Sequence, residues 1–391
     1  MVFLRESRMT DAKRSIYISK PSLDEEEWQA LREPIFSGWL TQGPKVAEFE
    51  KAFAKAHGVG FSIATTSCTT ALHLALLALN IGPGDEVIVP AFTWVATANA
   101  IKYAGAKPVF CDIEGDTYNI DIRKAKRVMT PRTKAVIPVH LFGLCADMDA
   151  LDEICRPKGI HIIEDAACAA GASYRGRMAG SLGDIGCFSF HPRKIITTGE
   201  GGMCTTNSRD LAERMVCLRN HGASISEEER HNGPKPYLLP DFNVVGYNYR
   251  MTDLQGAIGI VQLGKLAGFL EERRRWAKWY GQELSGIDWL TTPHVPDGYG
   301  HSYQSYVCYV DAEKAPVKRD HLMEILHERR ISTRPGTHAL HMLGYYARTY
   351  GLRPEDFPSA RDCDANTLAL PLHNRMTPDD YLYVVRTLKE V

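Results

Sequence analysis

The sequence has 391 residues, of which 44% are hydrophobic and 24% are charged, and its formal net charge at pH 7 is -1. This length is typical of a large domain followed by a smaller one. The near-neutral charge does not favour nucleic-acid binding, and no apolar run is long enough to predict a membrane span. We therefore expect an ordinary globular protein with no nucleic-acid partner and no membrane partner.

Ten cysteines are scattered through the chain, mostly in apolar segments, and none forms a Cys-x-x-Cys pair. Free buried thiols are typical of a reducing compartment, so the sequence predicts a cytoplasmic location. The short, charged opening, residues 1–16, is expected to form a tail rather than a signal peptide. Neither metal-ligand spacing nor a dinucleotide fingerprint is present, so we expect no metal and no NAD.

Two helices are predicted near the start of the folded chain. A capping box over residues 22–25 predicts a helix from about Leu23 to Phe36. Pro44 suits the first turn of a second helix, which is expected to end at Gly58. The irregular loop between them contains a tryptophan, and this arrangement is typical of a lid or rim.

Apolar runs and helical patterns then alternate along the chain. Strands are predicted at 61–64, 86–90, 107–112, 135–139, 160–164 and 187–190, and helices at 69–79 and 94–103. Several of these runs are apolar throughout rather than at every second residue, as expected when helices cover both faces of a sheet. The sequence therefore predicts an α/β fold with a largely parallel sheet.

The pattern changes after Asp253. A long helix is predicted from Leu254 to Leu270, continuing through the charged run that follows towards Trp279. A strand over 303–310 and a helix over 320–329 come next. We divide the chain into an N-terminal tail at 1–16, a large domain at 17–260 and a smaller C-terminal α+β domain at 261–391.

Polar clusters lie at the carboxyl ends of the predicted strands, where ligands bind in such sheets. The run from Thr65 to Thr70 joins a strand to a helix, so its hydroxyl and N–H groups suit a phosphate. Simple N-capping is the alternative interpretation. Trp94 ends another strand, where its ring would stack on a planar ligand or belong to the core.

Two acids end a third strand. Asp165 follows Glu164 directly, and a carboxylate buried there requires a positively charged partner. A protonated pyridine nitrogen would be such a partner. Two alternatives stay open: Asp165 caps a helix or pairs with an arginine, and Glu164 pairs with an arginine.

Lys194 lies five residues after Ser189 and just ahead of a glycine-rich turn at 199–202. A lysine that forms an imine must lie off the surface, lose its proton easily and sit where glycines let the backbone approach a ligand. Taken alone, Lys194 could equally be a solvated surface charge. Together with a phosphate cradle, a stacking aromatic and an acid, it indicates a pyridoxal phosphate (PLP) site.

Five segments in the same order resemble the DegT/DnrJ/EryC1/StrS family of PLP-dependent sugar aminotransferases. They are Ser67 to His73, Pro90 to Thr97, Glu164 to Ala167, Ser189 to Gly202 and Gly246 to Asp253. The resemblance extends from about Tyr17 to the C-terminus. It implies the PLP-dependent transferase fold of type I, the aspartate aminotransferase type, with a sheet of the seven-stranded kind.

The resemblance also implies roles for residues of the cofactor site. Lys194 would form the Schiff base, Asp165 would keep the pyridine nitrogen protonated, and Trp94 would stack on the ring. Phosphate contacts would come from Ser67, Cys68, Thr69 and Ser189, and from Asn248 of a second subunit. The last contact implies a homodimer with two shared active sites.

Cys168 departs from the pattern, because the family commonly has Gln or His three residues after the acid. A thiol is a weak hydrogen-bond partner, so its contact near the cofactor ring is expected to differ. The residues that resemble substrate contacts of the family are Arg250, Arg334, His338 and His341. The particular sugar stays open, since Gly-Thr-His at 336–338 replaces bulkier residues of some perosamine-type members.

The function that the resemblance implies is transamination. An amino acid, expected to be L-glutamate, would leave its nitrogen on the cofactor, and a keto sugar would take it up, with Lys194 as general base. The expected acceptor is a nucleotide-linked 4-keto-6-deoxy or 3-keto sugar, in the biosynthesis of amino sugars of lipopolysaccharide O-antigen or antibiotics.

Three alternatives stay open. The acceptor could be a ketocyclitol or a keto sugar without a nucleotide. A PLP-dependent sugar dehydratase is disfavoured, because those members carry histidine where this chain has Lys194. A non-catalytic regulator on the same fold is disfavoured by the intact set of Lys194, Asp165, Ser189 and Asn248.

Overall fold

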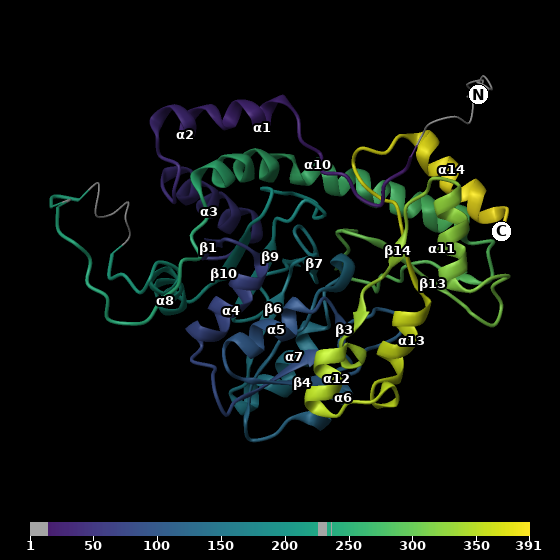
Figure 1. The fold of residues 1–391 in the computed structure, drawn as a ribbon, viewed down its shortest axis with the longest axis horizontal. Helices are drawn as coiled ribbons and strands as arrows, with labels where there is room; N and C mark the ends of the chain where they lie inside the picture. The colour runs from purple at the N-terminus through teal and green to yellow at the C-terminus, as the bar shows by residue number, and fades with distance from the viewer. Residues whose placement is uncertain (1–14, 226–232, 236) are drawn as a thin grey trace.

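The computed structural model shown in Figure 1 describes residues 15–225, 233–235 and 237–391. Most of the predicted N-terminal tail, residues 1–14, lies outside the described residues. Ile16 is buried, and its backbone N–H donates to the carbonyl of Arg330 at 2.9 Å. The chain therefore joins the C-terminal part of the fold before it enters the first helix.

A seven-stranded sheet forms the centre of the molecule, with the order β1-β10-β9-β6-β5-β2-β4. Its strands are β1 (Phe61–Thr65), β2 (Glu86–Pro90), β4 (Lys107–Cys111), β5 (Thr133–Val136), β6 (His161–Asp165), β9 (Ile185–Ser189) and β10 (Gly202–Thr206). From β9 to β4 all neighbours are parallel, whereas β10 runs antiparallel to both β1 and β9. The predicted α/β fold with a mostly parallel sheet is confirmed, and β10 is a strand that the sequence pattern missed.

Helices cover both faces of this sheet, as the apolar strands predicted. They are α3 (Pro44–His57), α4 (Cys68–Ala78), α5 (Ala96–Tyr103), α6 (Ile122–Val128), α7 (Met148–Cys155) and α8 (Arg209–Arg219). Consecutive strand residues enter different cores: Ile163 packs with α4, α5 and α8, whereas Ile162 packs with α3, α6 and α7. Each strand of the central sheet is therefore buried on two sides.

The first predicted helix is split. The structure has α1 (Glu25–Ala30) and α2 (Arg32–Ser37), and the N-cap is Asp24, whose box partner is Glu27, rather than Ser22 with Glu25. Pro34 explains the break, because it has no N–H to donate to the carbonyl four residues earlier. The second helix, α3, begins at Pro44 and ends at Gly58 in the left-handed conformation, as predicted.

The helix α10 (Asp253–Leu284) is longer than predicted and links the two parts of the fold. In Figure 1 it runs along the top of the central sheet towards the C-terminal elements. A Cβ atom at Gly259 would lie 2.6 Å from the Phe49 ring, so glycine lets α10 pack closely on α3. Further along, Tyr280 and Leu284 enter a third core.

A second, antiparallel sheet has the order β11-β13-β16-β14. Its strands are β11 (Leu290–Thr291), β13 (Tyr306–Val310), β14 (Arg334–Pro335) and β16 (Thr367–Leu370), and the helices around it are α11 (Arg319–Glu328), α12 (Gly344–Tyr350), α13 (Pro358–Asn366) and α14 (Pro378–Lys389). The predicted boundary between residues 260 and 261 falls inside α10, and the division into domains stays a prediction. No helix of the described residues is both long and apolar enough to cross a membrane.

Smaller elements complete the fold. A three-stranded sheet joins β12 (Tyr299–Gly300), β7 (Ser173–Tyr174) and β8 (Arg177–Met178), and a two-stranded sheet joins β3 (Phe92–Thr93) to β15 (His338–Ala339). The pairing of β3 with β15 brings the C-terminal part of the chain to the strand end that carries Trp94. This contact therefore forms one wall of the candidate site.

Candidate active site

The N-terminus of α4 lies directly after β1. Ser67 is its N-cap: the Ser67 hydroxyl accepts from the Thr70 N–H at 3.2 Å, and the Ser67 N–H donates to the Thr70 hydroxyl at 3.0 Å. The capping interpretation is therefore confirmed. Capping does not exclude anion binding, because the first N–H groups of a helix have no partner within it.

The strand β10 closes against this helix end. A Cβ atom at Gly202 would lie 2.4 Å from the backbone of Ser67 and 2.7 Å from the N atom of Cys68, so only glycine fits. Gly202 also pairs with Ser189 at the end of β9, which brings the Ser189 hydroxyl to the same region. The Cys68 thiol points away from it, towards the carbonyl of Cys187 at 3.6 Å. Cys68 could therefore contact a phosphate only through its backbone.

Asp165 ends β6, the strand beside β9. Its carboxylate is buried and accepts from the Thr97 hydroxyl at 2.7 Å and the Ala167 N–H at 3.1 Å. Burial raises the pKa of Asp165, and the two hydrogen bonds and the positive charge of Lys194 only partly oppose it. No arginine pairs with it among the described residues. A cationic ligand atom would stabilise the ionised form, and a pyridinium N–H provides one.

Glu164 points to the opposite side of β6, and its partners are backbone N–H groups and a histidine rather than an arginine, which was one of the open alternatives. Its carboxylate accepts from the N–H groups of Gly180, Leu182 and Gly183 at 2.7 to 2.8 Å, and it lies 2.9 Å from the His140 Nε2 atom. The His140 Nδ1 atom accepts from the Ala146 N–H at 3.2 Å, so the Nε2 atom carries the proton and donates to Glu164.

The His140 backbone N–H donates to the carbonyl of Asp165 at 3.0 Å. The histidine thus joins the Glu164 network to the strand end that carries Asp165. The sequence analysis did not identify His140 and Thr97 as hydrogen-bond partners of Asp165. Thr97 could have been found from its position three residues after Trp94, because a hydroxyl in the first turn of a helix turns back towards the preceding strand end.

Lys194 lies in the turn after β9, and its side chain is half-buried. The Lys194 Nζ atom donates to the Cys168 Sγ atom at 3.2 Å. Burial lowers the pKa of Lys194, but the charge and hydrogen bond of Cys168, together with Cys68 and Asp165, raise it above its ordinary value. The lysine is therefore no solvated surface charge, and the Cys168 thiol contacts this amine.

Trp94 and His338 lie side by side at the mouth of the site. Trp94 is 61% exposed, and its ring centroid is 5.8 Å from that of His338, which β15 places against β3. An indole this exposed has a free face for a planar ligand. The interpretation of Trp94 as a core aromatic is wrong.

Asn248 and Arg250 lie next to Asn220. Asn248 is exposed and forms a backbone bridge with Asn220, whose side-chain oxygen accepts from the Arg250 Nη1 atom at 2.7 Å. The buried Arg250 Nε atom has no partner in the described structure. This geometry suits a contact with another molecule.

The two remaining substrate candidates differ in access. Arg334 is half-buried in β14, and its buried Nε atom has no partner among the described residues. His341 is fully buried: its ring packs on Phe357, and its Nε2 atom faces the carbonyl of Pro354 at 3.4 Å. Because a side chain in this position cannot reach a substrate, we leave His341 out of the proposed site.

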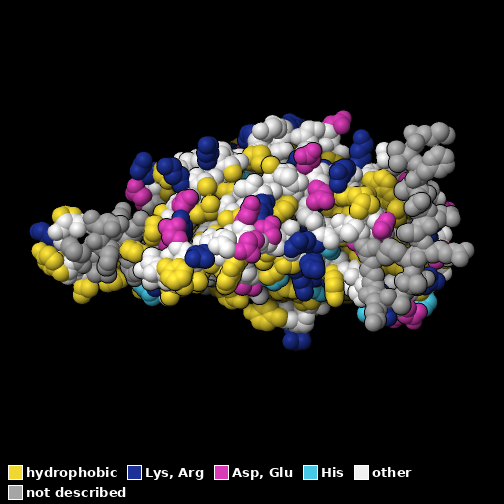
Figure 2. Space-filling view, turned by 90° about the horizontal axis from the view of Figure 1, so that it is seen from above, with side chains coloured by type: hydrophobic (Ala, Val, Ile, Leu, Met, Phe, Trp, Pro, Cys, Tyr) yellow, Lys and Arg dark blue, Asp and Glu magenta, His cyan; other side chains and the backbone are white. Residues whose placement is uncertain are grey.

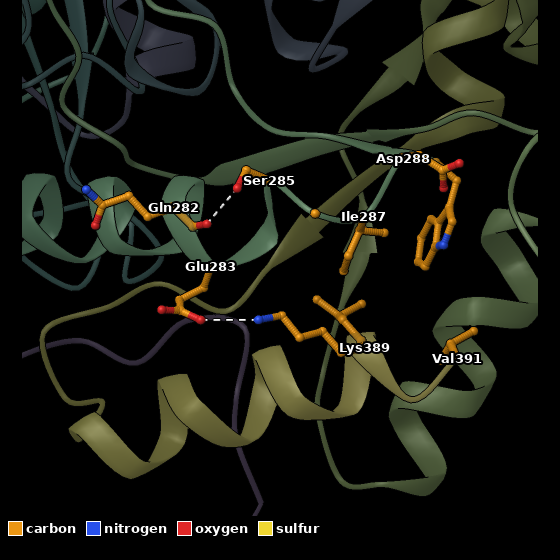
Figure 3. Close-up of a pocket in the computed structure, with 10 residues that line it drawn as sticks. Gln282, Glu283, Ser285, Ile287, Asp288, Lys389 and Val391 are labelled. Atoms are coloured by element: carbon orange, nitrogen blue, oxygen red, sulfur yellow. Dashed lines mark hydrogen bonds and ion pairs between the residues drawn. The ribbon is translucent and has the colours of Figure 1, made fainter.

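An open hollow elsewhere does not belong to this chemistry. It has a volume of about 490 Å³ and lies between the end of α10 and α14, where Glu283 and Lys389 pair at 3.2 Å (Figure 3). None of the candidate residues lines it. The candidate site is instead the convergence of the α4 N-terminus, Asp165 and Lys194 at the carboxyl ends of β1, β6 and β9.

These residues fit PLP. The first N–H groups of α4 suit a phosphate, the buried Asp165 carboxylate suits a protonated ring nitrogen, and Lys194 supplies an amine for the aldehyde. The site can hold a cofactor of this shape with residues from three strand ends. Among the described residues, no group of His, Cys, Asp or Glu could hold a metal ion.

Comparison with known proteins agrees with this geometry. Residues 21–389 match the DegT/DnrJ/EryC1/StrS aminotransferase family. The chain is 42% identical to the GDP-perosamine synthase of Caulobacter vibrioides over 98% of this chain and all of that protein. It is 41% identical to the spore coat polysaccharide biosynthesis protein SpsC of Bacillus subtilis over 95% of this chain and 96% of that protein.

Solved structures lead to the same class. The PLP form of the putative sugar aminotransferase Spr1654 from Streptococcus pneumoniae superimposes with a TM-score of 0.89 at 28% identity, over 96% of this chain and 98% of that one. A PMP form of the same protein gives a TM-score of 0.88. Fold and site thus define a PLP-dependent sugar aminotransferase. The chain belongs to the DegT/DnrJ/EryC1/StrS aminotransferase family.

Cys168 gives a testable consequence for pH dependence. Replacing it with alanine removes the hydrogen bond and charge that raise the pKa of Lys194, so the pKa of this amine should fall. The free amine would then be available at lower pH. The pH profile for capture of added PLP by the apoenzyme, followed by absorbance, should shift to lower pH.

Two variants control this measurement. Cys168→Ser keeps a hydrogen-bond partner and should shift the profile less. Cys217→Ala removes a half-buried thiol on α8 and should leave the profile unchanged. An unshifted profile in Cys168→Ala would show that the thiol does not set the protonation of Lys194.

Proposed function

We propose that the protein transfers an amino group from L-glutamate to a nucleotide-linked keto sugar. The observation that carries this proposal is the placement of Lys194 and the buried Asp165 at the ends of two adjacent parallel strands, beside the α4 N-terminus. The GDP-perosamine synthase relative supports a sugar attached to a nucleoside diphosphate, and our first candidate for that sugar is the 4-keto-6-deoxy form. A 3-keto sugar is the second candidate.

Bound PLP would supply the electron sink for this chemistry. Asp165 would hold the ring nitrogen in its protonated state, so that the ring accepts electrons well. Lys194, released from the cofactor, would carry the proton between the α carbon of the substrate and the adjacent carbon of the cofactor. The Thr97 hydroxyl, 2.7 Å from Asp165, would fix the orientation of the carboxylate. Trp94 would cover one face of the ring.

The experiment follows the two half-reactions by absorbance. L-Glutamate should convert the PLP form of the purified protein to the PMP form, and a keto-sugar nucleotide should restore the PLP form. The panel includes a 4-keto and a 3-keto sugar nucleotide, a free keto sugar and a ketocyclitol. Restoration by the ketocyclitol alone would overturn the proposed acceptor, and no conversion by any amino acid would overturn the proposed transamination.

Two other functions make different predictions in this experiment. A sugar dehydratase would release water from the sugar without uptake of amino nitrogen, and Lys194 argues against it. A regulator would bind PLP and not respond to amino donors. The Lys194 amine argues against that role because it lies off the surface beside Cys168, in the turn after the strand next to the one that ends in the buried Asp165.

We propose that two copies of the chain form a homodimer with shared sites. The segment between α8 and α10 extends beyond α8 at the left edge of Figure 1, and Figure 2 shows hydrophobic side chains at its tip. The exposed ones include Leu239 at 84% and Val245 at 87%. Apolar side chains this exposed support a protein contact, and the same segment carries Asn248 and Arg250.

A mixing experiment tests the shared site. Asn248→Ala should weaken PLP retention by about 1.5 to 3 kcal/mol, the usual contribution of a hydrogen bond to a charged group. In a mixed dimer with Lys194→Ala, one site would carry both defects and the other neither. Activity at limiting PLP should therefore rise after subunit exchange. If exchange is confirmed by mass spectrometry and activity does not rise, Asn248 acts within its own chain.

A further inference from the structure

Two arginines near the candidate site have no acidic partner among the described residues. Arg193 is the immediate neighbour of Lys194 in the chain, and Arg334 comes from β14 of the second sheet. Both residues line one small hollow, together with Gln304 and Ser19. No carboxylate of the described structure pairs with either of them. Like charges held this close repel each other, so the arrangement favours an anion between them.

The charges in this hollow are electrostatically linked to the catalytic lysine. Burial lowers the pKa of Arg334, the positive charge of Arg193 lowers it further, and the Cys168 sulfur partly opposes them. That sulfur is 3.2 Å from the Lys194 Nζ atom. Burial likewise lowers the pKa of His191, Glu200 opposes this, and the charges of Lys194, Arg193 and Arg334 lower it further.

The Arg193 backbone is held in place. The Gln304 side-chain amide donates to the Arg193 carbonyl at 3.0 Å, and the Ser305 hydroxyl donates to the Gln304 side-chain oxygen at 3.1 Å. Arg193 itself is exposed, whereas the Arg334 Nε atom is fully buried and unpartnered. One half-buried and one exposed arginine can therefore take the two oxygens of a single anionic group.

We propose that Arg193 and Arg334 form the subsite for the α-carboxylate of the amino donor and of the 2-oxo acid that leaves. The proposal rests on the proposed transamination. The α-carboxylate is bonded directly to the carbon that reacts at Lys194, so its subsite must lie next to that lysine. The phosphates of a nucleotide sugar lie beyond the sugar ring, farther from the reacting carbon.

The first test measures the two half-reactions in the PLP-loaded enzyme. In Arg193→Gln, the L-glutamate concentration for half-maximal conversion should rise about tenfold or more, and Arg334→Gln should behave alike. The dependence on keto-sugar nucleotide should stay within about twofold. Arg386→Gln on α14 is the matched control, because it removes an equally exposed guanidinium. The opposite pattern, with only the sugar half-reaction weakened, would assign the pair to phosphate and overturn the proposal.

The second test identifies the donor group. L-Isoglutamine, with the α-carboxylate replaced by an amide, should be a poor donor for the wild type and should lose little more in Arg193→Gln. L-Glutamine, which keeps the α-carboxylate, should remain sensitive to the substitution. Equal sensitivity for both amides would overturn the assignment.

A binding measurement separates this proposal from the proposed function. Calorimetry with glutarate, which carries two carboxylates and no amino group, should show affinity about tenfold weaker in Arg193→Gln than in the wild type or in Arg386→Gln. Guanosine diphosphate should bind all three proteins equally. If no amino acid converts the cofactor of the wild-type protein while glutarate binding still depends on Arg193, the proposed transamination is wrong and the proposed carboxylate subsite is supported. Glutarate binding independent of Arg193 would overturn the subsite.

Discussion

Replacing Lys194 with alanine should abolish turnover and leave a folded protein that still binds PLP. The proton transfer depends on this amine, so the loss should exceed the roughly 10²- to 10⁴-fold contribution of general acid–base catalysis. In the proposed site the phosphate and ring contacts would come from other residues, among them the α4 N-terminus and Asp165. Single-turnover kinetics with glutamate and a thermal unfolding curve give the two measurements.

A second lysine serves as the control for this experiment. Lys278 is exposed on α10, and Lys278→Ala should behave as the wild type in both measurements. The absorbance of PLP bound to Lys194→Ala should resemble that of the free aldehyde, since the protein amine is missing. Turnover in Lys194→Ala near the wild-type rate would overturn the assignment of the catalytic lysine.

The second large effect is expected for Asp165→Asn. An amide cannot stabilise a pyridinium charge as a carboxylate does, so the rate of the glutamate half-reaction should fall by roughly 10²-fold or more. The Thr97 and Ala167 contacts can persist, because an amide both accepts and donates hydrogen bonds. Stopped-flow absorbance gives the rate, and circular dichroism gives the stability.

The stability of Asp165→Asn apoenzyme should not fall with its activity. The pKa of Asp165 is raised by burial in the folded apoenzyme, so its ionised form destabilises the fold at pH above the folded-state pKa. This penalty disappears as the pH falls below the ordinary range for aspartate. Asp165→Asn apoenzyme should therefore be at least as stable as the wild type at neutral pH, with the difference shrinking in acid. A less stable variant of unchanged activity would show that the acid is structural.

Local pattern accounts for much of what could be predicted. The α/β fold followed from apolar runs such as Glu86–Pro90, and the prediction of a phosphate site followed from a hydroxyl-rich junction between strand and helix. Capping at Ser67 and the end of α3 at Gly58 depend on the backbone of a few neighbouring residues. Such features are readable without knowledge of the rest of the chain.

Errors arose where a distant or missing partner decides the outcome. The break between α1 and α2 follows from one missing N–H at Pro34, and Asp24 rather than Ser22 became the cap. An arginine partner was one open alternative for Glu164, but three backbone N–H groups of a later turn and His140 surround it. His341 lies in a suggestive motif and is nevertheless buried against Phe357.

The sequence by itself determined the class of this protein, because the five segments that resemble the family are short runs of neighbouring residues, with a lysine suited to an imine, an acid at a strand end and a hydroxyl-rich helix start among them. Tertiary structure decided which side chains meet. The contact of Lys194 with Cys168 joins residues 26 positions apart, and Arg193, in the turn after β9, lines one hollow with Arg334 of β14. Long-range packing sets those pairings, and with them the charge, burial and proton affinity of the groups that perform the chemistry.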